Sequence, residues 1–184
     1  MDINKLPPGS NPPHEINVLI EVPLRSDPIK YEYDKDSGFI FVDRYLYTTM
    51  FYPCNYGFIP NTLSGDGDPI DVMVVGRMPV MSGAILRARP IGVLEMEDEA
   101  GMDEKLLAVP IDKITQINRN VRTYKDLPEI DVARIAHFFE HYKDLEPNKW
   151  VKVLGWQGPE RAQELILEGI ERAKGKLEPS GSQA

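Results

Sequence analysis

Cysteine and long apolar segments are what this sequence most clearly lacks. Cys54 is the single cysteine in 184 residues, so no disulfide can form within the chain, and this composition fits a reducing compartment. No apolar run approaches the roughly 20 residues that a membrane-spanning helix needs. Residues 1–9 have no apolar core of the signal-peptide type. We therefore expect a cytoplasmic protein without a membrane partner.

Positive charge is also scarce. The chain has 21 Lys and Arg against 29 Asp and Glu, which gives a formal net charge of −8 and a pI near 4.9. This balance argues against nucleic acid as the main partner, and an anionic substrate could approach only with metal ions or at a local basic cluster. Hydrophobic residues make up 42% of the chain and charged residues 27%, as in globular proteins, so we expect residues 1–184 to form a single domain.

The most informative stretch is residues 65–72, Gly-Asp-Gly-Asp-Pro-Ile-Asp-Val, where Asp66, Asp68 and Asp71 stand close together. Two unit charges about 4 Å apart repel by about 4 kcal/mol at an effective dielectric near 20, so such a group favours a bound cation. Short acidic loops supply the oxygen ligands that Mg²⁺ and Mn²⁺ prefer. The alternative is a solvated acidic turn, because Asp-Gly is also a common hairpin signal. The spacing does not match a calcium-binding EF-hand loop.

Alternating and apolar segments predict a mainly β protein that ends in two helices. We expect an extended arm at 1–15 and a disordered tail at 175–184, since both are rich in Pro, Gly or small polar residues. A small closed barrel is the favoured arrangement, with the helices packed on it. The expected strands are 16–22, 29–34, 39–44, 70–75, 84–97, 106–109 and 150–153, and the expected helices are 128–143 and 159–174.

The hairpin formed by 29–34 and 39–44 has two possible registers. If Lys30 lies opposite Arg44, two cations face each other, which favours a bound anion such as phosphate. If the pairing slips by one residue, Lys30 faces Asp43 and forms an ordinary surface salt bridge. The residues alone leave both registers open.

A second acidic turn occupies residues 98–105 and leads into a strand. Asp103 and Lys105 share one strand face by the period of two, which suits either a metal–phosphate complex or an exposed salt bridge. The aromatic segment 45–64 comes before both acidic segments in the chain. Most of its rings are expected in the core, although tyrosines at a site entrance could donate hydrogen bonds to an anion.

The helix expected at 128–143 has two apolar faces, and this pattern is typical of a helix that contacts both its own domain and a second subunit. The first face holds Val132, Ile135, Ala136, Phe139 and Tyr142, and the second holds Ile130, His137, Phe138, His141 and Leu145. Residues 137–141, His-Phe-Phe-Glu-His, also match the H-x-x-E-H pattern of zinc peptidases. A catalytic zinc needs a third protein ligand, and no candidate stands out after His141.

Residues 66–72 resemble the signature D-x-D-P-[aliphatic]-D-[aliphatic] of family I soluble inorganic pyrophosphatases, and segments 27–32, 51–60, 98–105 and 137–143 resemble that family in its chain order. The length resembles the short prokaryotic type. The resemblance implies a five-stranded OB-like barrel with two helices and a homohexamer, built as a dimer of trimers. From its two apolar faces, we expect the 128–145 helix at an interface of this oligomer. It implies hydrolysis of pyrophosphate to two phosphates with several Mg²⁺ ions per subunit, for which Mn²⁺ or other divalent ions could substitute.

The resemblance also implies roles for individual residues. Asp66, Asp71 and Asp103 would ligate the metals that activate a water, and Asp68 would take its proton as the general base. Asp98, with Asp103, would hold a further metal, while Glu21 and Glu32 would act mostly through metal-bound waters. The groups that would hold the phosphoryl groups are Lys30, Arg44, Tyr56, Tyr142 and Lys143, supported by Lys105, Tyr52 and Glu32. It implies that Lys30 and Arg44 share the site and that His137 and His141 are not zinc ligands.

Two other function classes remain as alternatives. A zinc peptidase would use His137 and His141, and zinc content with peptide cleavage would identify it. A non-enzymatic OB-type module would bind single-stranded nucleic acid, although the net charge of −8 counts against it.

Overall fold

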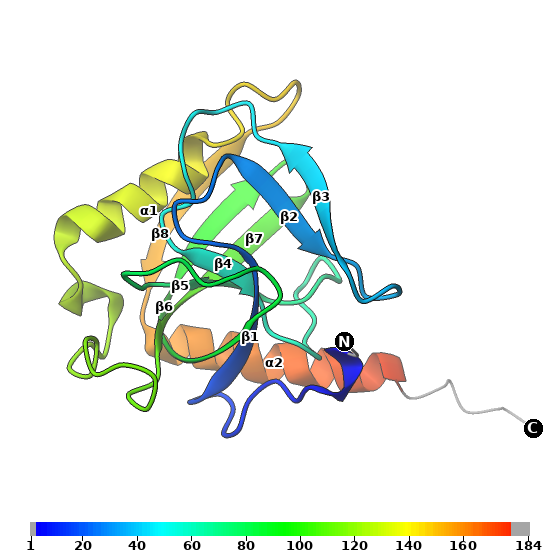
Figure 1. Cartoon of the computed structure of the whole chain (residues 1–184), viewed down its shortest axis with the longest axis vertical. Coiled ribbons are helices and arrows are strands. Elements are labelled where there is room, and N and C mark those ends of the chain that lie inside the picture. Colours follow the sequence, from blue (N-terminus) through cyan, green and yellow to red (C-terminus); the bar gives the residue numbers. More distant parts are fainter. Residues whose placement is uncertain (1–2, 178–184) are drawn as a thin grey trace, which may run out of the picture.

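The computed structural model describes residues 3–177, and within this range the chain forms eight strands, two α-helices and two short 3₁₀ helices (Figure 1). The strands are β1 (Ile16–Val22), β2 (Ile29–Tyr33), β3 (Ile40–Tyr45), β4 (Asn55–Phe58), β5 (Asp71–Val74), β6 (Ile85–Asp98), β7 (Gly101–Pro110) and β8 (Val151–Gln157). The helices are α1 (Glu129–His141) and α2 (Pro159–Leu177), and the 3₁₀ helices are Ile3–Lys5 and Tyr124–Asp126.

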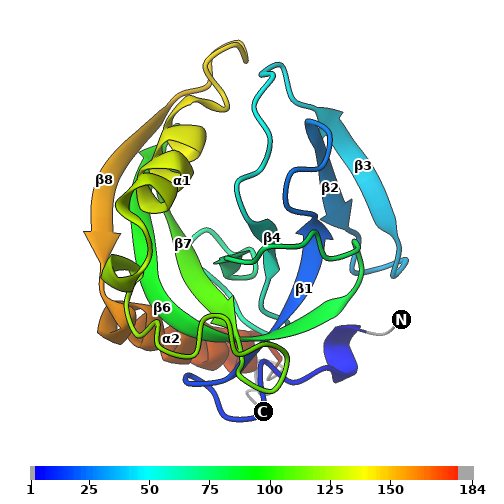
Figure 2. The same ribbon diagram turned by 60° about the vertical axis from the view of Figure 1, so that its left-hand side comes forward.

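Five strands pair in a closed ring in the order β1-β4-β5-β7-β6, because β6 pairs back with β1 (Figure 2). Leu19 is the point of closure, since it lies opposite Phe58 on one side and Ile85 on the other. Strands β5 and β7 are parallel, and β8 extends the sheet beyond β6. The prediction of a mainly β fold with two helices, built on five strands that close on themselves, is confirmed.

Strand β1, predicted at 16–22, is buried along its whole length. One set of its side chains, including Ile16 and Ile20, packs in a cluster with Ile166 of α2. On the opposite side, Leu19 packs against Ile3 of the N-terminal segment and Tyr33 of β2. Both faces are covered because α2 and the N-terminal segment lie on different sides of the strand.

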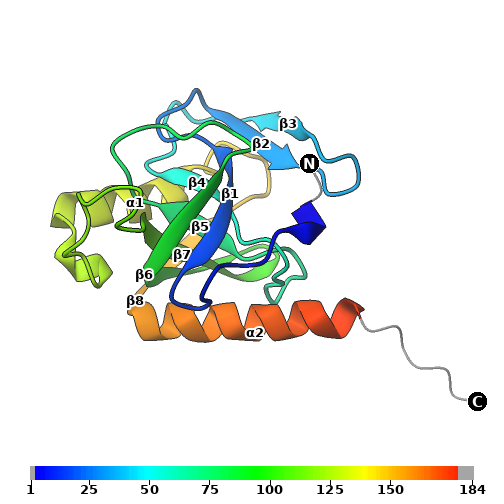
Figure 3. The same cartoon turned by 60° about the horizontal axis from the view of Figure 1, so that its bottom comes forward.

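Helix α2 lies along one side of the ring against β6 and β8 (Figure 3). The helix predicted at 159–174 is confirmed, and it buries Ala162, Leu165 and Ile166. The helix continues to Leu177, so the expected start of the tail at residue 175 is three residues too early. The remainder of that predicted tail, 178–184, lies outside the described residues.

Helix α1 buries Ile135, Phe138 and Phe139, and this corrects one prediction. Phe138 was expected on the second apolar face, but its ring lies 4.8 Å from that of Tyr52 and belongs to the core. Ile130 and Leu145, which were assigned to the same second face, remain exposed on the single chain.

The N-terminal segment is attached to the barrel more closely than an extended arm. It contains the 3₁₀ helix at 3–5, and Ile3 is buried. The Asn17 side chain donates a hydrogen bond to the Pro7 carbonyl at 2.9 Å, and the Asn61 side chain donates one to the Leu6 carbonyl at 2.8 Å. Within residues 3–177, neither helix is long and apolar enough to cross a membrane.

Candidate active site

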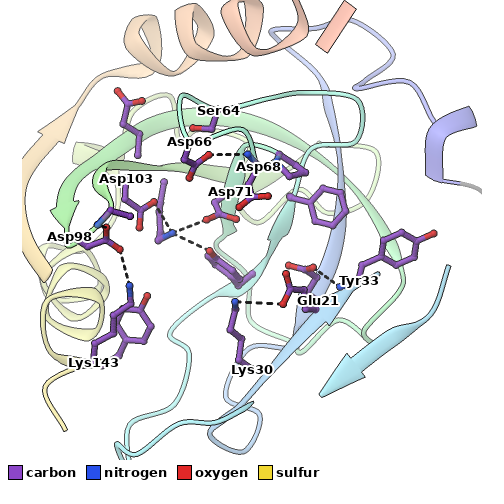
Figure 4. Close-up of a pocket in the computed structure, with 18 of the residues that line it drawn as sticks. Glu21, Lys30, Tyr33, Ser64, Asp66, Asp68, Asp71, Asp98, Asp103 and Lys143 are labelled. Atoms are coloured by element: carbon purple, nitrogen blue, oxygen red, sulfur yellow. Dashed lines mark hydrogen bonds and ion pairs between the residues drawn. The ribbon is translucent and has the colours of Figure 1, made fainter. Parts of the chain in front are cut away.

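Every site residue that the family resemblance implied lines one cavity of about 320 Å³ (Figure 4). The cavity lies where β1, the β2–β3 hairpin, the acidic loop before β5, the β6–β7 turn and the end of α1 meet. Segments as far apart in the chain as Glu21 and Lys143 therefore contribute to one site. Their individual roles remain predictions.

The acidic loop is folded by its own polar groups. The backbone N–H of Asp68 donates to the Asp66 carboxylate at 3.0 Å, and the N–H of Ser64 donates to the Asp68 carbonyl at 2.7 Å. Gly67 has φ of 93°, a left-handed conformation that glycine adopts without a steric cost. Figure 4 shows that the Asp66, Asp68 and Asp71 side chains gather on one side of the cavity as a result.

Lys105 lies among the acidic groups. Its ammonium contacts the Asp71 carboxylate at 2.7 Å, the Asp103 carboxylate at 3.0 Å and the Tyr56 hydroxyl at 3.1 Å. The parallel pairing of β5 with β7 brings Asp71 and Lys105 together. Burial disfavours the ammonium, because Lys105 is only 3% exposed, but Asp71, Tyr56 and Asp103 outweigh this and hold its pKa well above the usual range.

Glu21 is a carboxyl group buried at the base of the site. It is 7% exposed, and the backbone N–H of Tyr33 donates to it at 2.8 Å. Burial raises its pKa to about 8, and the nearby Asp71 carboxylate acts in the same direction. A cation bound close to a carboxyl group in such surroundings stabilises its charged form.

The hairpin register brings Lys30 opposite Arg44, the alternative that favours an anion site. The other predicted contact is present as well, because the Asp43 carboxylate lies 3.2 Å from the Lys30 ammonium and 2.9 Å from the Arg44 guanidinium. A bulge after Lys30 shifts the pairing, so both contacts occur in one hairpin. The register with Lys30 opposite Arg44 is therefore the one observed, and the Lys30–Asp43 salt bridge forms within it.

The end of α1 supplies the remaining groups. The Lys143 ammonium contacts the Asp98 carboxylate at 2.8 Å, and both side chains are only about one-tenth exposed. The Tyr142 ring stacks on Phe138 with centroids 5.4 Å apart. Burial raises the pKa of the Tyr52 and Tyr56 hydroxyls, so both are neutral hydrogen-bond donors at neutral pH.

Four further polar residues line the cavity that sequence reasoning did not find, namely Lys35, Ser64, Glu104 and Lys149. Lys149 forms an ion pair with Glu99 and reaches the site from the loop after α1. Glu104 pairs with Arg161 of α2 at 3.0 Å. Glu104 lies within the predicted acidic segment 98–105 but was assigned no role, and no motif marks Lys149, because long-range packing brings it to the cavity.

The metal-binding capacity of the site rests on the chemistry of its donors. Of the residues that the structure describes, eight carboxylates and six cationic side chains line the cavity, and no Cys or His is among them. Such an oxygen-only donor set fits a hard cation such as Mg²⁺. Among residues 3–177, no three His, Cys, Asp or Glu side chains are arranged as a ready metal cluster. In this arrangement Lys105 lies between Asp71 and Asp103, and Lys143 holds Asp98.

The two histidines of the H-x-x-E-H pattern lie outside this cavity. Their rings are 4.6 Å apart on α1, and His141 contacts the Asp144 carboxylate at 2.8 Å.

A comparison with protein-family models matches residues 18–174 to the family described as inorganic pyrophosphatase. The chain belongs to the inorganic pyrophosphatase family. The curated inorganic pyrophosphatase of Rhodospirillum rubrum is 60% identical over 170 residues, which are 92% of this chain and 95% of that protein. The curated inorganic pyrophosphatase of Aquifex pyrophilus is 58% identical over 174 residues, 95% of this chain and 98% of that protein.

Solved structures of this pyrophosphatase family agree with the observed fold. The inorganic pyrophosphatase of Thermus thermophilus has a TM-score of 0.90 at 42% identity, with 95% of this chain and 100% of that chain covered. A structure from Anaplasma phagocytophilum, described as an inorganic phosphatase, has a TM-score of 0.91 at 53% identity and covers 92% of this chain and 99% of that one. The match spans nearly all of these bacterial proteins, so this chain has the short prokaryotic form.

Proposed function

We propose that this protein hydrolyses inorganic pyrophosphate to two phosphates in a Mg²⁺-dependent reaction. The observation that supports this most directly is the cavity of about 320 Å³, lined by carboxylates from the acidic loop and by cations from the hairpin and the end of α1. A small polyanion with bound cations matches both sets of groups. The protein's relatives in the family are named for the same reaction.

The acidic groups fit a site for divalent cations. Asp66, Asp71 and Asp103 would hold one group of Mg²⁺ ions, Asp98 with Asp103 a further one, and Glu21 and Glu32 would act through waters. When bound, Mg²⁺ neutralises the substrate and lowers the pKa of a water that attacks phosphorus. The acidic protein and its anionic substrate are then compatible, since pyrophosphate arrives as a metal complex.

Asp68 is the general base in this proposal. Its side chain is exposed to the cavity and has no ion-pair partner within the described range 3–177, whereas Lys105 engages Asp71 and Asp103. An unpaired carboxylate can accept a proton without first breaking an ion pair. Asp68 therefore removes the proton of the attacking water, and the paired aspartates retain their charge.

The cationic side chains bind and orient the two phosphoryl groups. Lys30 and Arg44 approach from the hairpin, Tyr142 and Lys143 from the end of α1, and Tyr56 from β4. Charge on the leaving phosphate develops during bond cleavage, so fixed cations stabilise the transition state more than the ground state. Lys105 and Tyr52 support these groups from the buried side of the cavity.

We further propose that the protein acts in the cytoplasm as a homohexamer, a dimer of trimers. Large apolar side chains are exposed on the single chain, including Ile130 and Leu145 around α1 and Phe39, Phe41 and Tyr45 on the hairpin. Such exposure is typical of surfaces that other subunits cover.

The decisive experiment measures phosphate release from pyrophosphate with Mg²⁺, with Mn²⁺ and after removal of metal by a chelator. We expect rapid release that depends on the divalent ion. Absence of release with either ion would overturn the proposal. Zinc-dependent peptide cleavage would then favour the peptidase alternative, and retention of single-stranded nucleic acid on a filter would favour the binding module.

A further inference from the structure

The loop between α1 and β8, residues 142–150, is joined to both sides of the cavity by three ion pairs. Lys143 contacts Asp98 at 2.8 Å, and Lys149 pairs with Glu99, so the loop is attached to the β6–β7 turn at two points. The third ion pair joins Glu146 to the hairpin, where its carboxylate lies 3.3 Å from Nε of Arg44. In Figure 1 this loop and the segment after β3 lie next to each other at the top of the molecule.

Within residues 3–177, the Glu146 side chain forms a single ion pair, with Arg44. Its side chain is 11% exposed, although a glutamate in a surface loop is ordinarily solvated. A carboxylate withdrawn from water to this extent needs a partner, and Arg44 is the partner it has among residues 3–177. The contact joins residues 102 positions apart in the chain, so it exists only in the folded protein.

The orientation of the Arg44 guanidinium depends on this contact. Nη1 donates to Asp43 at 2.9 Å and Nε donates to Glu146 at 3.3 Å, while Nη2 has no bonded partner among the described residues. Asp43 precedes Arg44 in β3 and moves with the hairpin, so it cannot hold the guanidinium relative to the rest of the site. Glu146 can, because it belongs to the loop 142–150, whose Lys143 and Lys149 line the cavity from the side of α1.

We propose that Glu146 is a positioning residue that orients the Arg44 guanidinium for the phosphoryl group of the substrate. The inference rests on the proposed function, in which Arg44 binds that group. A guanidinium is planar, so two donors held by carboxylates determine the direction of the third nitrogen. Orienting the Arg44 guanidinium before the substrate arrives reduces the entropic cost of binding. Glu146 touches neither substrate nor metal and acts only through Arg44.

The test compares Glu146→Ala with Glu146→Gln, which keeps an oxygen acceptor of the same length. We expect the alanine variant to raise KM for magnesium pyrophosphate about ten-fold while kcat falls less than about three-fold, because the variant keeps the Arg44 charge and loses only its orientation before the substrate binds. The KM of Glu146→Gln should lie close to the wild-type value. Glu171→Ala, which removes an exposed glutamate paired with Lys174 on α2, is the matched control and should leave both constants unchanged.

A double-mutant cycle separates a role through Arg44 from a general structural role. If Glu146 acts through Arg44, adding Glu146→Ala to Arg44→Ala should cost nothing beyond Arg44→Ala alone. If the KM increases of the two single variants multiplied in the double variant, the proposal would be overturned. An unchanged or lowered KM in Glu146→Ala would overturn it as well.

The binding of inorganic phosphate, measured by calorimetry in Mg²⁺, gives a readout that does not need turnover. We expect Glu146→Ala to weaken it about ten-fold and Glu146→Gln to restore it. A wild-type protein that releases no phosphate would refute the proposed function. An active wild-type protein whose Glu146→Ala variant binds phosphate and substrate normally would refute the positioning role alone.

Discussion

The three aspartates of the acidic loop differ in their surroundings although they lie within six residues. Asp71 begins β5 and is paired with the buried Lys105 at 2.7 Å. Asp66 accepts a hydrogen bond from the loop backbone, and the Asp68 carboxylate faces the cavity without an ion pair within the described range 3–177. Identical side chains therefore suit different tasks.

Substitution of these aspartates should separate metal binding from proton transfer. We expect Asp68→Asn to lower kcat by about 10²- to 10⁴-fold, the usual contribution of a general base, with little change in the Mg²⁺ concentration needed. Asp71→Asn should instead raise that concentration at least about ten-fold, as the loss of groups around a metal commonly does. The measurement is phosphate release against Mg²⁺ concentration.

The control for this pair is Asp36→Asn in the turn of the β2–β3 hairpin, an aspartate that does not line the 320 Å³ cavity. It should behave as wild type. Near-normal turnover by Asp68→Asn would exclude Asp68 as the general base.

Cys54 should be inert in the native protein. The thiol is 3% exposed, and burial raises its pKa to about 12 because the thiolate is poorly solvated there. At pH 8 only about one molecule in ten thousand would carry the reactive thiolate. We expect no reaction with a thiol-specific disulfide reagent at pH 8 and one thiol per chain after unfolding in guanidinium chloride. Stoichiometric labelling of the native protein within minutes would contradict this.

At the scale of elements, helix α2 supports the acidic loop through a close approach at Gly169. A Cβ atom at this position would lie 2.4 Å from Cδ1 of Ile70 and 3.0 Å from the Leu63 carbonyl oxygen. The Gly169 carbonyl also accepts a hydrogen bond from the Leu63 N–H at 2.9 Å. The helix therefore contacts both ends of the segment that holds Asp66 and Asp68.

Two glycines of α2 provide a matched pair for this contact. We expect Gly169→Ala to lower the free energy of unfolding by about 1–3 kcal/mol through overpacking against Ile70 and Leu63. Gly175 lies on the same helix and has open space around it. Gly175→Ala should raise the free energy of unfolding by up to about 1 kcal/mol, because alanine favours the helix. Denaturant unfolding measures both values, and equal effects of the two substitutions would show that the close approach is unimportant.

At the scale of the whole molecule, the proposed hexamer would cover apolar side chains that the single chain exposes. Six copies of the 20.9 kDa chain have a mass of about 125 kDa, which sedimentation or light scattering can measure. We expect Ile130→Glu combined with Leu145→Glu to reduce that mass, because both side chains are exposed around α1 and their replacement does not disturb the core.

Leu167→Glu is the control for the assembly, since Leu167 is also an exposed apolar residue but lies on α2. It should leave the mass unchanged. A wild-type protein that sediments as a single chain would contradict the hexamer, and an undiminished mass in the Ile130 and Leu145 variant would contradict the role of the 128–145 helix.

The sequence by itself determined the residue types of the site and the local structures that hold them. Asp66, Asp68 and Asp71 stand in one loop, and apolar periodicity predicted most strands and both helices, because these properties depend on near neighbours in the chain. Resemblance to a family then joined the separate motifs into one expected site.

Only the tertiary structure decided the contacts between distant segments. It buried both faces of β1 and with them Glu21, it brought Lys105 between two aspartates, and it joined Glu146 to Arg44. These contacts depend on strand register, on the bulge after Lys30 and on packing of α1, α2 and the N-terminal segment around the ring. Local periodicity contains no information about such pairings, because each is set by residues that meet only when the ring closes.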